Sequence, residues 1–147
     1  MKTRALLAAL ICSLVLPPIF AEDNSPSELD DWMEQMNTAY RKLTRQIADP
    51  AKNADSLKQI ATIRDRATEA AKLEPKKKAD IPAAEQVKFV ADYQAKMKTF
   101  LADIDKLEAA VKAGKNEEAA ALVKTLKQAQ EDGHKQFKRG KEKKKAG

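Results

Sequence analysis

Apolar residues recur at alternating intervals of three and four residues through most of this chain, and this spacing limits its fold more than any other feature. From Leu29 to Ile47 the apolar positions are separated by 4, 3, 4, 3 and 4 residues. From Val90 to Val111 they are separated by 3, 4, 3, 4, 3 and 4 residues. An α-helix places residues at these intervals on one face. Each series therefore predicts a helix with one buried stripe.

Two further stripes predict two more helices. The second helix in chain order has an alanine-rich stripe, formed by Leu57, Ile60, Ile63, Ala67 and Ala70 or Ala71. The last helix has a stripe formed by Ala119, Val123, Leu126, Gln130, His134 and Phe137. Four helices with short connections pack most simply as antiparallel neighbours. We therefore predict an all-α protein, an antiparallel up-down-up-down four-helix bundle over residues 22–140.

Capping and helix-stopping residues predict where the helices begin and end. Ser27 with Asp30 three residues later predicts the start of the first helix, since the two side chains can satisfy free backbone N–H groups there. Asp49-Pro50 should end this helix, and Asn53 is expected to cap the next one. The remaining boundaries are expected at Glu74-Pro75, Gly114, Asn116 and Gly140.

The first 21 residues read as a secretory signal peptide. Lys2 and Arg4 precede an apolar run over residues 5–15, and Ala21 supplies a small residue for cleavage. The run is too short to span a bilayer, so we expect no stable membrane insertion after cleavage. Cleavage would also remove Cys12, the only cysteine, and with it any disulfide or thiolate ligand.

Charge limits the classes of partner. The net charge of +6 at pH 7 is modest, and together with export it argues against a nucleic-acid partner. We expect the lysine run at 76–78 and the basic tail at 141–147 to be solvated. Steering of an acidic redox partner, or contact with an anionic membrane, is the alternative for both segments. We expect the protein to be a monomer.

Met33 and the single histidine, His134, should face each other at one end of the bundle. Met33 lies six residues after Ser27, and His134 lies six residues before Gly140. At a rise of about 1.5 Å per residue, each lies roughly 9 Å from that end. Methionine and histidine form a known axial pair for haem iron. The alternatives are a methionine that only fills the core and a histidine that only interacts with the helix dipole.

Three segments resemble the cytochrome b562 family, over about residues 28–139. They are Asp30-Asp31-Trp32-Met33-Glu34-Gln35-Met36-Asn37, Gly114-Lys115-Asn116-Glu117-Glu118-Ala119 and His134-Lys135-Gln136-Phe137-Lys138. The resemblance implies one non-covalent b-type haem with iron, bound by Met33 and His134 as axial ligands. It also implies a periplasmic electron carrier that exchanges electrons with a redox partner protein.

The resemblance also implies which residues surround the haem. Tyr93 and Met97 stand where the family has two pocket phenylalanines, and Leu29 and Pro75 fall near other pocket positions. Three positions near His134 depart from the family's pattern: Gln130 and Lys138 stand for arginines, and Gly133 stands for a bulky aromatic residue. Lys138 could pair with a haem propionate as a point charge. These departures imply a haem that is more exposed or more loosely held.

Two other classes of function are alternatives to a haem electron carrier. The sequence contains no nucleophile with a base, no Gly-rich phosphate loop and no carboxylate–histidine arrangement of the di-iron type, so we do not expect an enzyme. A cofactor-free exported helical bundle, acting as an adaptor, chaperone or stress protein, would share the same plain core and charged surface. The Met33 and His134 pairing is the feature that separates it from a haem protein.

Overall fold

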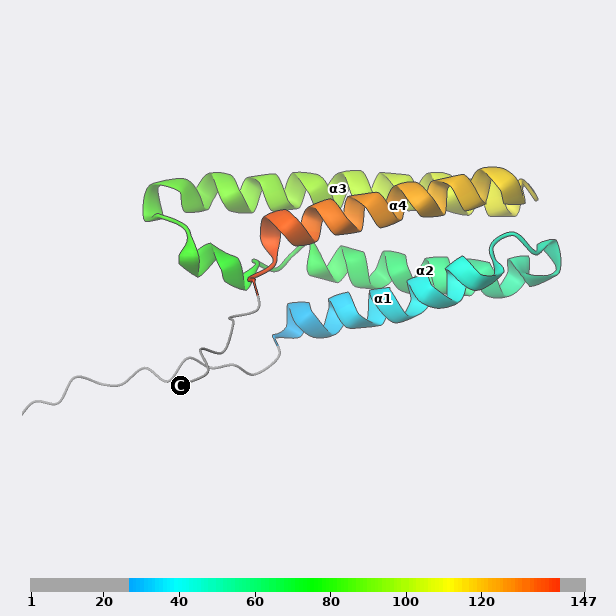
Figure 1. The fold of residues 1–147 in the computed structure, drawn as a ribbon, viewed down its shortest axis with the longest axis horizontal. Helices are drawn as coiled ribbons and strands as arrows, with labels where there is room; N and C mark the ends of the chain where they lie inside the picture. The colour runs from blue at the N-terminus through cyan, green and yellow to red at the C-terminus, as the bar shows by residue number, and fades with distance from the viewer. Residues whose placement is uncertain (1–26, 141–147) are drawn as a thin grey trace, which may run out of the picture.

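The structure, a computed structural model, describes residues 27–140. In chain order its elements are α1 (Glu28–Gln46), η1 (Pro50–Lys52), α2 (Asn53–Ala70), η2 (Lys76–Asp80), α3 (Ala83–Lys112) and α4 (Asn116–Phe137). The α-helices run antiparallel in an up-down-up-down bundle, which confirms the expected all-α fold (Figure 1). The expected signal peptide at 1–21 and basic tail at 141–147 lie outside the described residues. No helix within residues 27–140 is both long and apolar enough to cross a membrane.

Consecutive helices make the closest backbone approaches, α1 with α2, α2 with α3 and α3 with α4. The first and last helices approach each other less closely, and side-chain hydrogen bonds join them. Tyr40 Oη donates to the Val123 carbonyl at 2.8 Å, and Asn116 Nδ2 donates to the Ile47 carbonyl at 2.7 Å. We call the boundary between these two helices the α1–α4 seam. The Tyr40 hydrogen bond lies near the middle of this seam, and the Asn116 hydrogen bond lies at its η1 end.

The core is built from the predicted stripes. The large side chains that are almost completely buried are Leu43, Ile60, Ile63, Ile104, Leu107, Val111 and Leu126. Burial of each leucine or isoleucine contributes about 1.5–3 kcal/mol. Ala67, Ala70 and Ala119 are also fully buried, and their small size lets neighbouring helices pack closely.

Local signals at two helix ends are confirmed. Ser27 Oγ accepts from the Asp30 backbone N–H at 3.2 Å, and Asp30 Oδ2 accepts from the Ser27 N–H at 3.0 Å. Gly114 has φ +70°, a left-handed conformation that L-residues with side chains rarely adopt, and it follows the last turn of α3. Two ends were wrong: α2 ends at Ala70 rather than at Glu74-Pro75, and α4 ends at Phe137 rather than at Gly140, because Lys138 takes an extended conformation.

The expected capping role of Asn53 was also wrong. Asn53 has helical backbone angles and is the first residue of α2, so its side chain is free to reach across the bundle. Its Oδ1 accepts from Asn116 Nδ2 at 2.7 Å. Asn116 is buried, and the same Nδ2 group also donates to Ile47. The two asparagines therefore join α1, α2 and α4 at the end of the bundle formed by η1 and the α3–α4 turn.

Candidate functional site

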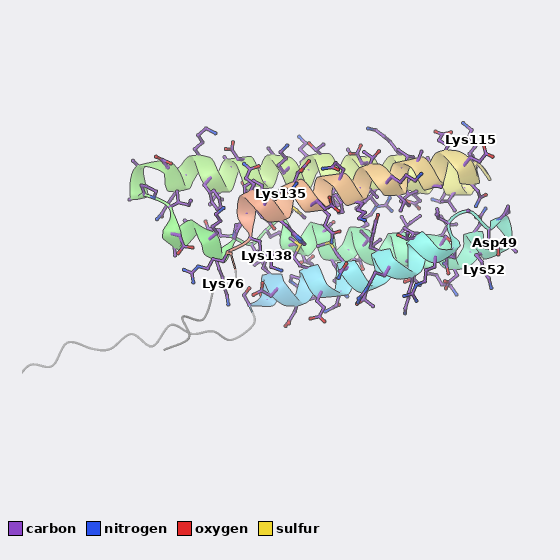
Figure 2. The ribbon with its side chains drawn as sticks, viewed as in Figure 1. Asp49, Lys52, Lys76, Lys115, Lys135 and Lys138 are labelled. Carbon is purple, nitrogen blue, oxygen red and sulfur yellow. The ribbon has the colours of Figure 1, made fainter. Side chains whose placement is uncertain are left out.

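The start of α1, η2 and the end of α4 meet at the opposite end of the bundle. The Asp30 carboxylate lies 3.7 Å from Lys76 Nζ. The hydrogen bond from the Ser27 backbone is the main cause of the lowered pKa of Asp30, and the charges of Lys76 and Lys138 lower this pKa further. Figure 2 shows Lys76, Lys135 and Lys138 near this end and Lys115 at the other.

The hydrogen bond from Tyr40 to Val123 sets the register of α1 against α4. Met33 lies two turns before Tyr40, and His134 lies three turns after Val123. In antiparallel helices both steps lead toward the same end, by about 10 Å and about 16 Å. Helical side chains lean toward the N-terminus of their own helix. The Met33 side chain therefore leans toward this end and that of His134 leans away from it, which shortens the offset along the seam.

Met33 and His134 lie at the edge of the core rather than at its centre. Met33 is half-buried and packs against the core, whereas His134 is exposed. The expected inward position of His134 was therefore wrong. Phe137, three residues later, is only 7% exposed and takes the central position instead.

The surroundings of His134 favour the neutral imidazole. Although His134 is exposed, neighbouring protein atoms desolvate its ring in part, which lowers the pKa of His134, and the positive charge of Lys138 lowers this pKa further. Neutral imidazole is the form that binds metal ions through a ring nitrogen. Toward this end, α1 thus carries a thioether and α4 an imidazole whose neutral form is favoured.

The apolar residues that were expected around the haem belong to the core of the bundle. Leu29, Tyr93 and Met97 are all buried and belong to one core cluster with Phe137. Tyr93 Oη donates to the Ala70 carbonyl at 2.8 Å, and burial raises the pKa of Tyr93 to about 12. The four side chains would exclude water from a ligand held at the seam.

Two aromatic residues of this region were not assigned to the pocket from the sequence. The Phe137 ring makes edge-to-face contacts with Tyr93, at a centroid distance of 5.4 Å, and with Phe89, at 5.3 Å. Phe137 was expected only as part of the core stripe. A signal for Phe89 was available, because it lies four residues before Tyr93 and so shares its helix face.

The other edge of α1 carries a second feature that was not anticipated. The Arg66 guanidinium of α2 lies 4.5 Å from the centre of the Trp32 ring. The Arg66 Nε atom is buried and has no hydrogen-bond partner among the described residues. Trp32 is thus fixed against α2, and the edge of α1 that bears Met33 faces α4.

The residues near His134 that depart from the family pattern lie around the site. Gln130 and Gly133 are half-buried, and Lys138 is exposed. A Cβ atom placed on Gly133 would meet nothing within 4 Å, so the space beside His134 is open. Pro75, by contrast, is buried next to η2.

Within the part of the chain that the structure describes, Met33 and His134 do not belong to a larger cluster of metal-binding side chains. Residues 27–140 contain no group of three or more His, Cys, Asp or Glu side chains that could hold a metal ion. A thioether and an imidazole are two side-chain types that bind haem iron.

Comparison with known proteins identifies a family. Residues 28–138 match the family described as Cytochrome b562. No curated protein matches the chain. The matched range begins with the first residue of α1 and ends just after α4, so it includes both Met33 and His134.

Proposed function

The chain belongs to the cytochrome b562 family, and we propose that it is an exported electron carrier with one non-covalent b-type haem at the α1–α4 seam. The family is one of haem-binding, electron-transfer cytochromes. One observation supports the proposal: in the register set by the Tyr40–Val123 hydrogen bond, Met33 and His134 both stand toward the same end of α1 and α4. Met33 and His134 would be the two axial ligands.

Each residue of the site has a role in this proposal. When bound, haem iron supplies a one-electron couple. His134 would hold the group firmly through a ring nitrogen, and the soft Met33 sulfur would favour the reduced state and raise the potential. Leu29, Tyr93 and Met97 would exclude water from its apolar face. Because both Met33 and His134 would be used to hold the group, neither side chain would be free to act in a reaction, and the site would suit electron transfer.

The open side of the site would leave part of the haem exposed. Gly133 leaves space beside His134, and Gln130 cannot supply a charge. Lys138, whose charge reaches both Asp30 and His134, would pair with a haem propionate. A lysine makes a weaker and less directional contact than the two-pronged contact of an arginine. An exposed haem edge is where an electron would pass to a partner.

Location and partners follow from the rest of the chain. We propose that residues 1–21 direct export to the periplasm and are then removed, that 22–140 form the haem domain and that 141–147 form a basic tail. The mature protein would act as a monomer and exchange electrons with a redox protein that has yet to be identified. It would bind no nucleic acid.

Titration of the purified mature protein with hemin tests the proposal. We expect a shift of the Soret band that saturates at one haem per chain, and a sharp α-band of low-spin haem after reduction. His134→Ala should lose this spectrum, because no second histidine is present to replace the ligand. Lys135→Ala, next to it and exposed, is the matched control and should keep it. No Soret shift in the wild type would favour the cofactor-free bundle.

A further inference from the structure

The short helix η2 crosses the α1–α4 seam at the end where the candidate site lies. Lys76 pairs with Asp30 in the first turn of α1 at 3.7 Å. The next residue, Lys77, donates from Nζ to the Gln136 carbonyl in the last turn of α4 at 2.7 Å. One segment therefore contacts both helices that border the seam, at the end that lies beyond the Tyr40 and Asn116 hydrogen bonds.

A two-pronged ion pair fixes the other end of η2 to the chain that follows α4. Arg139 Nε donates to Asp80 Oδ2 at 2.8 Å, and Arg139 Nη2 donates to Asp80 Oδ1 at 2.8 Å. Such paired contacts between arginine and carboxylate are more directional than a single hydrogen bond. Arg139 lies one residue beyond the stretch that matches the family, so the family match does not account for this pair.

Polar contacts, rather than core burial, hold η2 in place. None of its residues is buried. Within the segment, Lys78 N–H donates to Pro75 at 2.9 Å and Ile81 N–H donates to Lys78 at 3.0 Å. These ion pairs and hydrogen bonds between η2 and α1, and between η2 and the chain around the end of α4, involve charged side chains, so salt should weaken them.

We propose that Arg139 is a positioning residue that, through Asp80, latches η2 across the open end of the α1–α4 seam and slows the loss of haem. This inference rests on the proposed function. A haem between α1 and α4 would leave more easily when the seam widens, and widening pulls η2 away from one of the two helices. Breaking the Arg139–Asp80 pair removes one restraint on that motion but leaves both axial ligands in place.

Rates of haem transfer to an excess of an apo-globin test the latch. Arg139→Gln and Asp80→Asn should each speed haem loss about two- to five-fold at low salt, the size expected for one exposed ion pair. The double variant should lose haem no faster than either single variant, and Asp80→Arg/Arg139→Asp should restore a slow rate. The spectrum of the reduced protein should not change, and high salt should remove the difference from wild type.

Lys115→Gln is the matched control for this experiment. It breaks an exposed pair with Glu118, 3.3 Å long, at the opposite end of the bundle, and it should leave the rate of haem loss unchanged. Unchanged rates in Arg139→Gln and Asp80→Asn would overturn the proposal. So would equal acceleration in Lys115→Gln, or a charge-swapped variant that loses haem as fast as the single variants.

Hydrogen exchange in the haem-free protein separates the latch from the proposed function. The amides of Lys78 and Ile81 report directly on η2, and they should exchange faster in Arg139→Gln than in the wild type. A wild type that binds no hemin would defeat the proposed function, yet this measurement would still test the latch. Equal exchange in the two proteins would defeat the latch, whether or not haem binds.

Discussion

Replacing Tyr93 with Phe changes one atom at the floor of the candidate site. The Tyr93 hydroxyl donates to the Ala70 carbonyl at 2.8 Å, and the residue is only 3% exposed. Phenylalanine keeps the ring, and so keeps the edge-to-face contact with Phe137. The substitution therefore isolates a single buried hydrogen bond between α3 and the end of α2.

The loss in stability can be worked out from this environment. A buried neutral hydrogen bond contributes about 0.5–1.5 kcal/mol net. The Ala70 carbonyl also accepts from the Leu73 N–H at 3.1 Å, so it would not be left unpaired. We therefore expect Tyr93→Phe to lower the free energy of unfolding by about 1 kcal/mol. With an m-value of about 1.5 kcal/mol/M, the urea midpoint would fall by roughly 0.7 M.

Urea unfolding of the haem-free mature protein, followed by far-ultraviolet circular dichroism, measures this loss. Tyr40→Phe is the matched control: its hydroxyl also donates to a carbonyl at 2.8 Å, but the residue is only half-buried. Water can replace that bond more easily, so the control should lose less stability. An equal or higher midpoint in Tyr93→Phe than in the wild type would refute the reasoning.

The dependence of the free energy of unfolding on pH above 10 gives a second test of the same substitution. Burial raises the pKa of Tyr93 from 10.0 to about 12. Between these values the unfolded chain releases the proton and the folded chain keeps it, so wild-type stability should fall as the pH rises from 10.0 toward 12. Tyr93→Phe should lose this part of the decline. The same alkaline decline in both proteins would contradict the assignment.

Three further predictions test the candidate site and the hydrogen bonds that hold the helices around it. Met33→Ala should leave five-coordinate haem with a lower reduction potential, measured by spectroelectrochemistry. Because Met36, one turn away, could replace the ligand, the double variant Met33→Ala/Met36→Leu is measured as well. An unchanged spectrum in the double variant would exclude Met33 as a ligand. Asn116→Ala should lower the free energy of unfolding by about 2–3 kcal/mol in urea, because it removes the partner of the buried Ile47 carbonyl and of the half-buried Asn53 side chain. A loss below about 0.5 kcal/mol would show that these bonds contribute little to stability. The pKa of Asp30 is lowered from its ordinary value of 3.8, so its ionised carboxylate stabilises the fold above pH 3.8, and this contribution is lost as the pH falls through the lowered pKa. In Asp30→Asn the melting temperature should therefore depend less on pH in the acid range. Identical curves of melting temperature against pH for the variant and the wild type would contradict this.

Features that depend on residues close in sequence could be predicted from the sequence. The 3- and 4-residue spacing gave the four helices and their buried faces, since a helix is a local structure. Ser27 and Gly114 marked helix ends correctly because capping acts over a few residues. Antiparallel order then followed from the short connections, and it brought Met33 and His134 to one end.

Features that depend on pairs far apart in sequence could not be predicted in this way. Asn53 bonds to Asn116, 63 residues away, and Asp80 pairs with Arg139, 59 residues away. Neither pair leaves a periodic signal, and the local capping preference of Asn53 pointed to a different role. The edge position of His134 was missed for a similar reason, because the packing of Phe137 against α3 decides which side chain takes the centre.

X-ray absorption at the iron edge of the hemin-loaded mature protein tests the central claim most directly. It counts sulfur and nitrogen neighbours of the iron without assuming which residues supply them. We predict one sulfur in addition to the porphyrin nitrogens and one imidazole nitrogen, with the sulfur lost in Met33→Ala/Met36→Leu and the imidazole lost in His134→Ala. An iron site without a sulfur neighbour in the wild type would contradict Met33 and His134 as the ligands.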